Sequence, residues 1–147
     1  MKHFSVITLF ALVCIFALSS CGGDTTNTTQ LTETDKRGYD PQQAVEALYN
    51  TLPDGDINQM KQAVKFKEED KLSDSQKDEF FKKLSEKKFK VEAKKAKDKN
   101  NDGVIKVKCK VTFSNGSSEE KKFKVVKEDD IWKTIIGYSE IQDAIYK

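Results

Sequence analysis

The stretch IKVKCKVTF, residues 105–113, alternates apolar and polar side chains without a break. Successive side chains of a β-strand point to opposite faces, so the stretch predicts a strand with one buried face and one lysine-rich face. The same period recurs at 89–94, around Phe123 and Val125, and at 131–136. Turn-forming residues separate the runs: Asn-Asp-Gly at 101–103, Asn-Gly at 115–116 and Glu-Asp-Asp at 128–130. We therefore predict a four-stranded antiparallel meander.

The residues before this sheet follow a helical period instead. Asp40 and Pro41 favour a helix start, which predicts a helix over about 41–51. Asp56 precedes a second helix, and Ser73 with Gln76 forms the capping box of a third helix that runs to about residue 87. The apolar stripe expected on the second helix is Ile57, Met60, Ala63 and Val64, and that on the third is Phe80, Phe81 and Leu84. A short helix from about Ser139 ends the chain. This order predicts an α+β fold, with N-terminal helices packed on one face of a curved sheet.

The N-terminus has the three zones of an export signal: a basic start, an apolar run from Phe4 to Leu18, and small residues before Cys21. The run is shorter than the roughly 20 residues that a membrane-spanning helix needs. The string Leu18-Ser19-Ser20-Cys21-Gly22 resembles the lipobox of bacterial lipoproteins. That resemblance implies a signal peptide over 1–20 and a lipidated Cys21 that holds the protein to the cell membrane or outer membrane, with its domain outside the cytoplasm. An ordinary secretory signal or an uncleaved anchor helix is the alternative.

The threonine-rich segment that follows Cys21 contains one large aliphatic residue, Leu31, and is expected not to fold by itself. We interpret residues 21–37 as a flexible tether, with an end-to-end distance of roughly 20–25 Å. Residues 38–147 then form a single domain, a size that suits one small core.

Removal of the signal takes away Cys14 and His3, so the mature chain has no histidine. Histidine-based triads and the usual zinc sites are thereby excluded, and we expect no cofactor. Cys109 is left without a disulfide partner and is expected to face the core as a small hydrophobe. Of the 26 basic residues only Arg37 is arginine, which argues against sequence-specific nucleic-acid binding.

Three segments, PQQAVEALYN (41–50), GDINQM (55–60) and VVKEDDIWK (125–133), resemble uncharacterised lipoproteins of the nuclear transport factor 2-like superfamily. The resemblance spans about residues 38–137. It implies a cone-shaped fold in which a sheet curls around a long helix. The superfamily hosts enzymes and binding modules alike, so the fold does not decide the function. Some relatives are isomerases with a carboxylate base and a tyrosine donor, and neither residue can be matched to a motif here.

Residues 98–103, DKNNDG, match the opening of a calcium-binding loop, with Asp98, Asn100 and Asp102 as candidate ligands. The twelfth position of such a loop should carry a bidentate carboxylate, and here it is Cys109. A plain polar hairpin loop is the alternative interpretation.

Strict alternation places one set of lysines on the outer sheet face, relieved mainly by Glu92. The set is Lys90, Lys94, Lys106, Lys108, Lys110, Lys122 and Lys124. Such a face would attract anionic lipid headgroups or acidic glycans. Alternatively it is a solvated surface whose lysines discourage aggregation.

Seven aromatic residues, Tyr49, Phe80, Phe81, Phe89, Phe113, Phe123 and Trp132, supply either a core or the walls of a pocket. We predict a membrane-anchored, non-catalytic domain that binds a small ligand or an envelope protein. The alternative is a small isomerase- or hydrolase-like enzyme that uses the interior of the cone, which would require an ionisable group in an apolar cavity.

Overall fold

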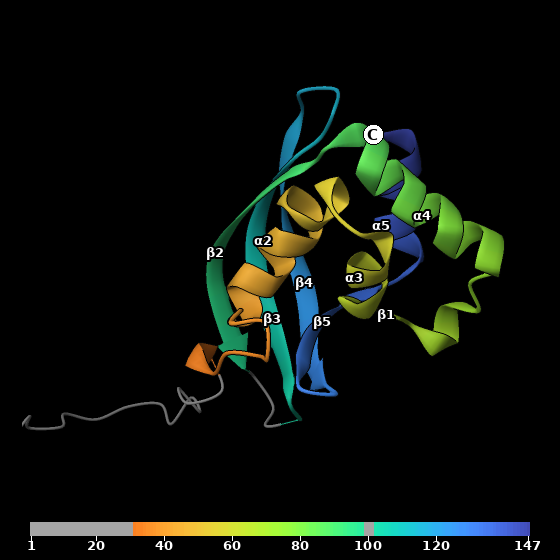
Figure 1. The fold of residues 1–147 in the computed structure, drawn as a ribbon. Helices are drawn as coiled ribbons and strands as arrows, with labels where there is room; N and C mark the ends of the chain where they lie inside the picture. The colour runs from red at the N-terminus through yellow and green to blue at the C-terminus, as the bar shows by residue number, and fades with distance from the viewer. Residues whose placement is uncertain (1–30, 99–101) are drawn as a thin grey trace, which may run out of the picture.

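A computed structural model describes residues 31–98 and 102–147 (Figure 1). Its helices are α2 (Pro41–Asn50), α3 (Ile57–Gln62), α4 (Asp74–Lys87) and α5 (Tyr138–Tyr146), with 3-10 turns at Leu52–Asp54 and Glu68–Asp70. Its strands are β1 (Val64–Phe66), β2 (Lys90–Asp98), β3 (Val104–Thr112), β4 (Ser118–Glu128) and β5 (Ile131–Ile136). The α+β class and the order of helices before the main strands agree with the sequence prediction.

The sheet has five strands in the order β1-β5-β4-β3-β2. β2 to β5 form the predicted antiparallel meander, but β1 is an additional strand that pairs in parallel with β5. The prediction of four strands, with Val64 on the second helix, was therefore wrong. α3 ends at Gln62, and the N–H of Thr134 donates to the carbonyl of Ala63 at 2.8 Å. The segment from Val64 pairs with the edge of β5, because the N–H and C=O groups of that edge need hydrogen-bond partners.

The helix starts follow the sequence signals closely. Gln43 N–H donates to the Asp40 carboxylate at 2.8 Å, and the Gln43 side chain accepts from the Asp40 N–H, which completes a capping box at α2. Ser73 and Gln76 form the same box at α4. The predicted inner residues of α4 are buried, whereas Ile57 at the start of α3 is 46% exposed. Ile57 therefore lies outside the stripe on which it was expected.

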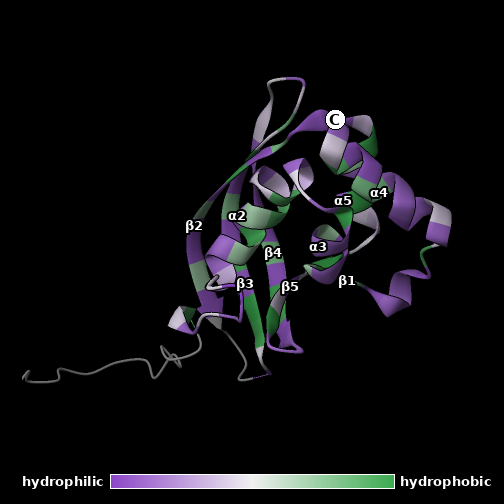
Figure 2. Ribbon diagram, in the orientation of Figure 1, coloured by the Kyte–Doolittle hydropathy of each residue, from purple (hydrophilic) through white to green (hydrophobic). Residues whose placement is uncertain are grey.

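The helices cover one face of the sheet and leave the other face open (Figure 1). α2 lies across the sheet, and α4 packs with α5 beside it. The core-facing side chains of β3, Ile105, Val107 and Cys109, are fully buried beneath the helices. Figure 2 shows the corresponding alternation of hydrophobic and hydrophilic bands along the strands. The period of two thus separates a dry inner face from a wet outer one.

The outer edge of β2 is partly covered by side chains of α2. Asn50 accepts from the Val91 N–H and donates to the Val91 carbonyl, both at 2.8 Å. Glu46 accepts from the Ala93 N–H at 2.7 Å. These bonds occupy the groups that an unprotected edge strand would offer to another chain.

Residues 31–37, which were predicted to belong to the tether, are bound to the β4–β5 hairpin. Asp35 is buried and accepts from the N–H of Trp132 at 3.0 Å and from Arg37 Nη2 at 2.6 Å. The Trp132 indole donates to the Glu33 carbonyl at 2.8 Å. The folded part therefore begins near Leu31 rather than at residue 38, because a buried carboxylate needs these donors and holds the segment in place.

Candidate functional site

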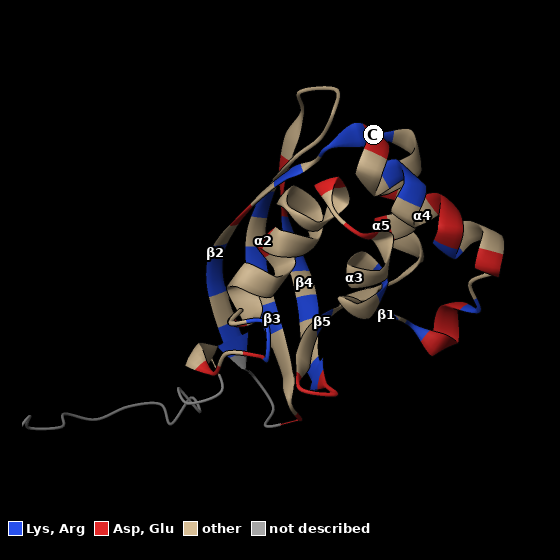
Figure 3. Cartoon of the chain, in the orientation of Figure 1, with Lys and Arg blue, Asp and Glu red and all other residues tan. Residues whose placement is uncertain are grey.

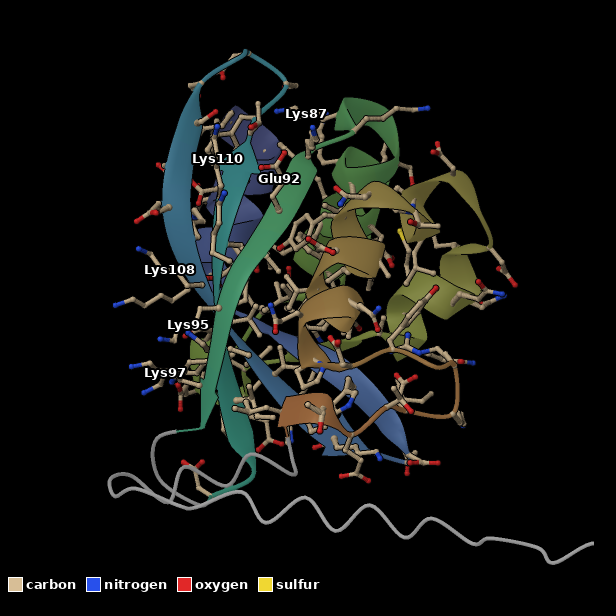
Figure 4. All side chains as sticks on the ribbon, turned by 90° about the vertical axis from the view of Figure 1, so that its left-hand side faces the viewer. Lys87, Glu92, Lys95, Lys97, Lys108 and Lys110 are labelled. Carbon is tan, nitrogen blue, oxygen red and sulfur yellow. The ribbon has the colours of Figure 1, made fainter. Side chains whose placement is uncertain are left out.

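Six lysines form a regular array on the open face of the sheet, and we call them the lysine patch. They are Lys95 and Lys97 on β2, Lys106 and Lys108 on β3, and Lys122 and Lys124 on β4. The pairing register places them in two rows of three: Lys95, Lys108 and Lys122 lie opposite one another, as do Lys97, Lys106 and Lys124. Figure 4 shows Lys95, Lys97 and Lys108 pointing away from the helices. The six side chains surround a depression of about 610 Å³.

Sequence alternation predicted four members of the patch and missed Lys95 and Lys97. The reason is a β-bulge in β2: the register shifts between Ala93 and Lys95, so that Lys94 is the extra residue. After the bulge Lys95 and Lys97 face outward and Ala96 faces the core. The sequence contains a signal of this bulge, because two adjacent lysines followed by an apolar alanine break the period of two.

The other predicted lysines, Lys90, Lys94 and Lys110, lie on the same face but beyond the patch, where two carboxylates partly offset their charge. Glu92 and Glu120 flank Lys110 on the neighbouring strands. Lys90 donates to Glu92 at 3.1 Å, and its hydrogen bond and charge lower the pKa of Glu92. This end of the face therefore carries three lysines and two carboxylates, a smaller excess of positive charge than the patch has.

The patch itself has little such compensation. Among the described residues, only Lys108 of the six has a carboxylate within 4.0 Å, at 2.6 Å from Glu120. The hydrogen bond and charge of Lys108 lower the pKa of Glu120, with further contributions from Lys94 and Lys122. Figure 3 shows the basic residues in bands across β2, β3 and β4, whereas α4 and the turn before it carry acidic and basic residues together. Positive charge is thus concentrated on the open sheet face although the sequence is nearly neutral.

Like charges placed directly opposite each other on neighbouring strands destabilise a sheet. The patch contains four such pairs: 95–108, 108–122, 97–106 and 106–124. All four pairs therefore act against the stability of the sheet. Isolated edge lysines would discourage aggregation at a lower cost, so aggregation resistance alone accounts poorly for an array on three strands.

Among the described residues, the cavity between the helices and the sheet is much smaller than the depression at the patch. A cavity lined by Tyr49, Phe89, Phe113 and their neighbours has a volume of about 20 Å³. That volume holds about one water molecule, whereas small-molecule sites usually measure about 300–1,000 Å³. The aromatic residues that were candidates for pocket walls instead pack on one another, for example Tyr49 on Phe123 with ring centroids 5.3 Å apart.

The ionisable groups beside this cavity all have structural roles. Burial, with smaller contributions from Glu140 and Cys109, raises the pKa of Tyr49 far above its usual range. Glu140 accepts from the Gly137 N–H at 2.8 Å and caps α5. Asp143 pairs with Lys121 and, at 3.1 Å, with Lys147. The arrangement leaves neither carboxylate free to act as a base on a substrate inside.

The other sequence candidates have little support. Asp98 lies in β2, but its side chain, Asn100 and the lipidation candidate Cys21 fall outside the part that the structure describes. Asp102 accepts from the Val104 N–H at 3.0 Å and lines a depression with Lys106 and Lys124, whose charges oppose cation binding. In residues 31–98 and 102–147 there is no group of three acidic, cysteine or histidine side chains placed to hold a metal.

Cys109 is fully buried, and burial raises the pKa of its thiol to about 12. A thiol in this state is a poor nucleophile, as the sequence predicted.

A family profile described as "Domain of unknown function (DUF4878)" matches residues 19–135. The chain belongs to this family. The DUF4878 match includes Cys21, the segment bound to the hairpin, the whole lysine patch and most of β5, and it ends before α5. It confirms that the chain contains an uncharacterised domain, and it assigns the domain no activity.

A solved structure from Campylobacter jejuni, described as an NTF2-like transpeptidase, resembles this DUF4878 chain with a TM-score of 0.35 and 16% identity. The similarity covers 65% of this chain and 93% of that one. A likeness this weak carries no argument about fold or activity. No curated protein matches the chain. None of the helices in the described ranges is long and apolar enough to cross a membrane.

Proposed function

We propose that this protein is a lipid-anchored envelope protein whose NTF2-like domain binds a partner through its surface and catalyses no reaction. The packed interior carries the proposal: the cavity lined by Tyr49 and Phe113 has a volume of about 20 Å³, and the acidic groups around it are engaged in helix capping and ion pairs. An isomerase or hydrolase would need an ionisable group facing a substrate-sized cavity.

Anchoring is supported by the agreement of the basic start, the short apolar run and the small residues before Cys21. Several acyl chains together hold a protein firmly at a membrane, whereas one chain holds it only marginally. The core of the domain lies between Ala44 and Ala144, so the anchor and the fold are separate parts of the chain.

The test of anchoring is Cys21→Ala in cells supplied with labelled fatty acid. We expect the variant to lose the label and to leave the membrane fraction. Cys109→Ala is the matched control, since its thiol is buried and should not be acylated. A Cys21→Ala protein that is still labelled and retained would refute the anchor.

The filled interior can be tested on protein purified from its native cells. When the protein is denatured, we expect mass spectrometry to detect no small molecule in stoichiometric amount beyond the acyl chains on Cys21. A one-to-one apolar compound would instead support the enzyme or carrier alternative.

A further inference from the structure

We propose that the lysine patch is a docking surface for anionic phospholipid headgroups, and that it lays the open face of the sheet on the membrane to which the chain is anchored. This inference rests on the proposed anchoring, and it names the partner of the surface. The physical basis is the number, spacing and accessibility of the charges in the patch.

The six charges are close enough to act together. Adjacent strands lie about 4.8 Å apart and alternate residues about 7 Å apart, so the Cα positions of the array span roughly 10 by 7 Å. The Debye length at physiological salt is about 8 Å. An anionic surface therefore interacts with all six charges at once, as it would with one multivalent cation.

The chemistry of the patch suits a surface better than a discrete ligand. Every side chain that lines the depression is lysine, whose compact charge on a flexible stem provides no fork for fixed recognition of a phosphate. Among the described residues, no aromatic side chain and no carboxylate lines the depression to orient a small molecule. Five of the six ammonium groups have no carboxylate of the described residues within 4.0 Å, so they can follow a fluid layer of headgroups on the open sheet.

The position of the anchor favours the membrane over a soluble polyanion. Leu31 is the tenth residue after Cys21, a length of chain that spans at most about 35 Å when fully extended. Leu31 begins the segment that lies beside the end of β2 nearest Lys97 (Figures 1 and 4). The patch is thereby confined near the headgroups, which raises its effective concentration there without any new contact.

Charge polarity gives the orientation. The turn at Glu68–Asp70 and the acidic residues of α4, such as Asp74 and Asp78, lie away from the patch (Figure 3). An anionic membrane attracts the sheet face more strongly than this side, where the acidic residues of α4 are matched in number by its lysines. The helices would then face away from the membrane.

The experiment uses the chain from Gly22 to Lys147, which keeps the whole core and lacks the anchor, in sedimentation with vesicles. We expect binding to vesicles that contain phosphatidylglycerol, none to pure phosphatidylcholine, and loss of binding at about 1 M salt, where the Debye length falls to about 3 Å. The double variant Lys106→Gln/Lys108→Gln should bind about 30-fold more weakly, since each lysine near an anionic surface contributes about a factor of five.

The matched control is Lys71→Gln/Lys82→Gln, which removes the same charge from exposed positions outside the patch and should bind within about twofold of the parent. Thermal unfolding should show the patch variant to be at least as stable as the parent, because it relieves like-charge pairs. Equal loss in both variants, or equal binding to both kinds of vesicle, would overturn the proposal. Binding to a soluble acidic polysaccharide but not to anionic vesicles would overturn it too.

The two experiments distinguish failure of the docking surface from failure of the anchor. If Cys21→Ala abolishes membrane retention and the vesicles show no binding, the anchor stands and the docking surface fails. If the vesicles bind and the Cys21→Ala protein is still acylated and retained, the anchor fails.

Discussion

Asp35→Asn tests whether one buried carboxylate fixes the N-terminal segment to the sheet. Oδ1 of Asp35 accepts from the backbone N–H groups of Arg37 at 2.8 Å and Tyr39 at 3.2 Å. Oδ2 accepts from Arg37 Nε and Nη2 at 2.9 and 2.6 Å, and from the Trp132 N–H at 3.0 Å. The side chain is inaccessible to solvent. Asparagine has the same shape but offers an acceptor at only one of the two oxygen positions.

The magnitude follows from this geometry. In its better orientation the amide keeps the three bonds on the Oδ2 side, and its NH₂ group then faces two backbone donors. Each unsatisfied buried donor costs about 1–3 kcal/mol, and the surviving bonds lose the strength that the charge gave them. Relaxation of the segment offsets part of the loss, so we expect about 3 kcal/mol. For a domain of this size that is about 12 °C in melting temperature.

The assay is urea and thermal unfolding of the chain from Gly22, with Asp78→Asn as the control. Asp78 is 73% exposed and lies 3.8 Å from Lys61, so its replacement should cost less than about 0.5 kcal/mol. If Asp35→Asn lowers the unfolding free energy by less than about 1 kcal/mol, Asp35 does not fix the segment in the way proposed.

The charge gives a second test. Burial alone would raise the pKa of Asp35, but the hydrogen bonds from Arg37 and from the N–H groups of Trp132, Arg37 and Tyr39 outweigh it and lower the pKa. A lowered folded-state pKa adds stability that is complete above the unfolded value of about 3.9 and is lost as the pH falls through the folded one. The difference in unfolding free energy between the parent and Asp35→Asn should therefore be constant above about pH 5 and become smaller at acidic pH. A gap that persists unchanged at the lowest pH would contradict this account.

Three further predictions concern the core and the edge of the sheet. Thr134→Val should raise the unfolding free energy by about 1 kcal/mol, because the buried hydroxyl has no hydrogen-bond partner among the described residues; a loss in urea unfolding would contradict this. Asn50→Ala should lower the unfolding free energy by about 2 kcal/mol and promote association between chains, since it leaves the Val91 N–H and carbonyl unpaired. Unchanged unfolding and sedimentation would refute the role of Asn50 in protecting the edge of the sheet. The Cys109 thiol should resist a disulfide reagent at pH 8 until urea unfolds the chain, because burial raises its pKa to about 12, and rapid labelling of the native protein would refute this.

The candidate site shows where sequence reasoning works and where it stops. Alternation placed Lys106, Lys108, Lys122 and Lys124 correctly, because the side-chain period of a regular strand is fixed by its backbone. It missed Lys95 and Lys97 because one extra residue at Lys94 reverses the facing of everything after it.

The sequence by itself determined the local structure: where α2 and α4 start, which strands make the meander, and which residues are apolar enough to be buried. Those features depend on neighbours within a few residues, through caps, turns and side-chain period. The tertiary structure alone decided that β1 joins β5, that Asp35 docks under Trp132, and that six lysines on three strands form one array. Each of these depends on groups far apart in the chain, whose pairing is set by register, by unsatisfied edges and by the desolvation of a buried charge.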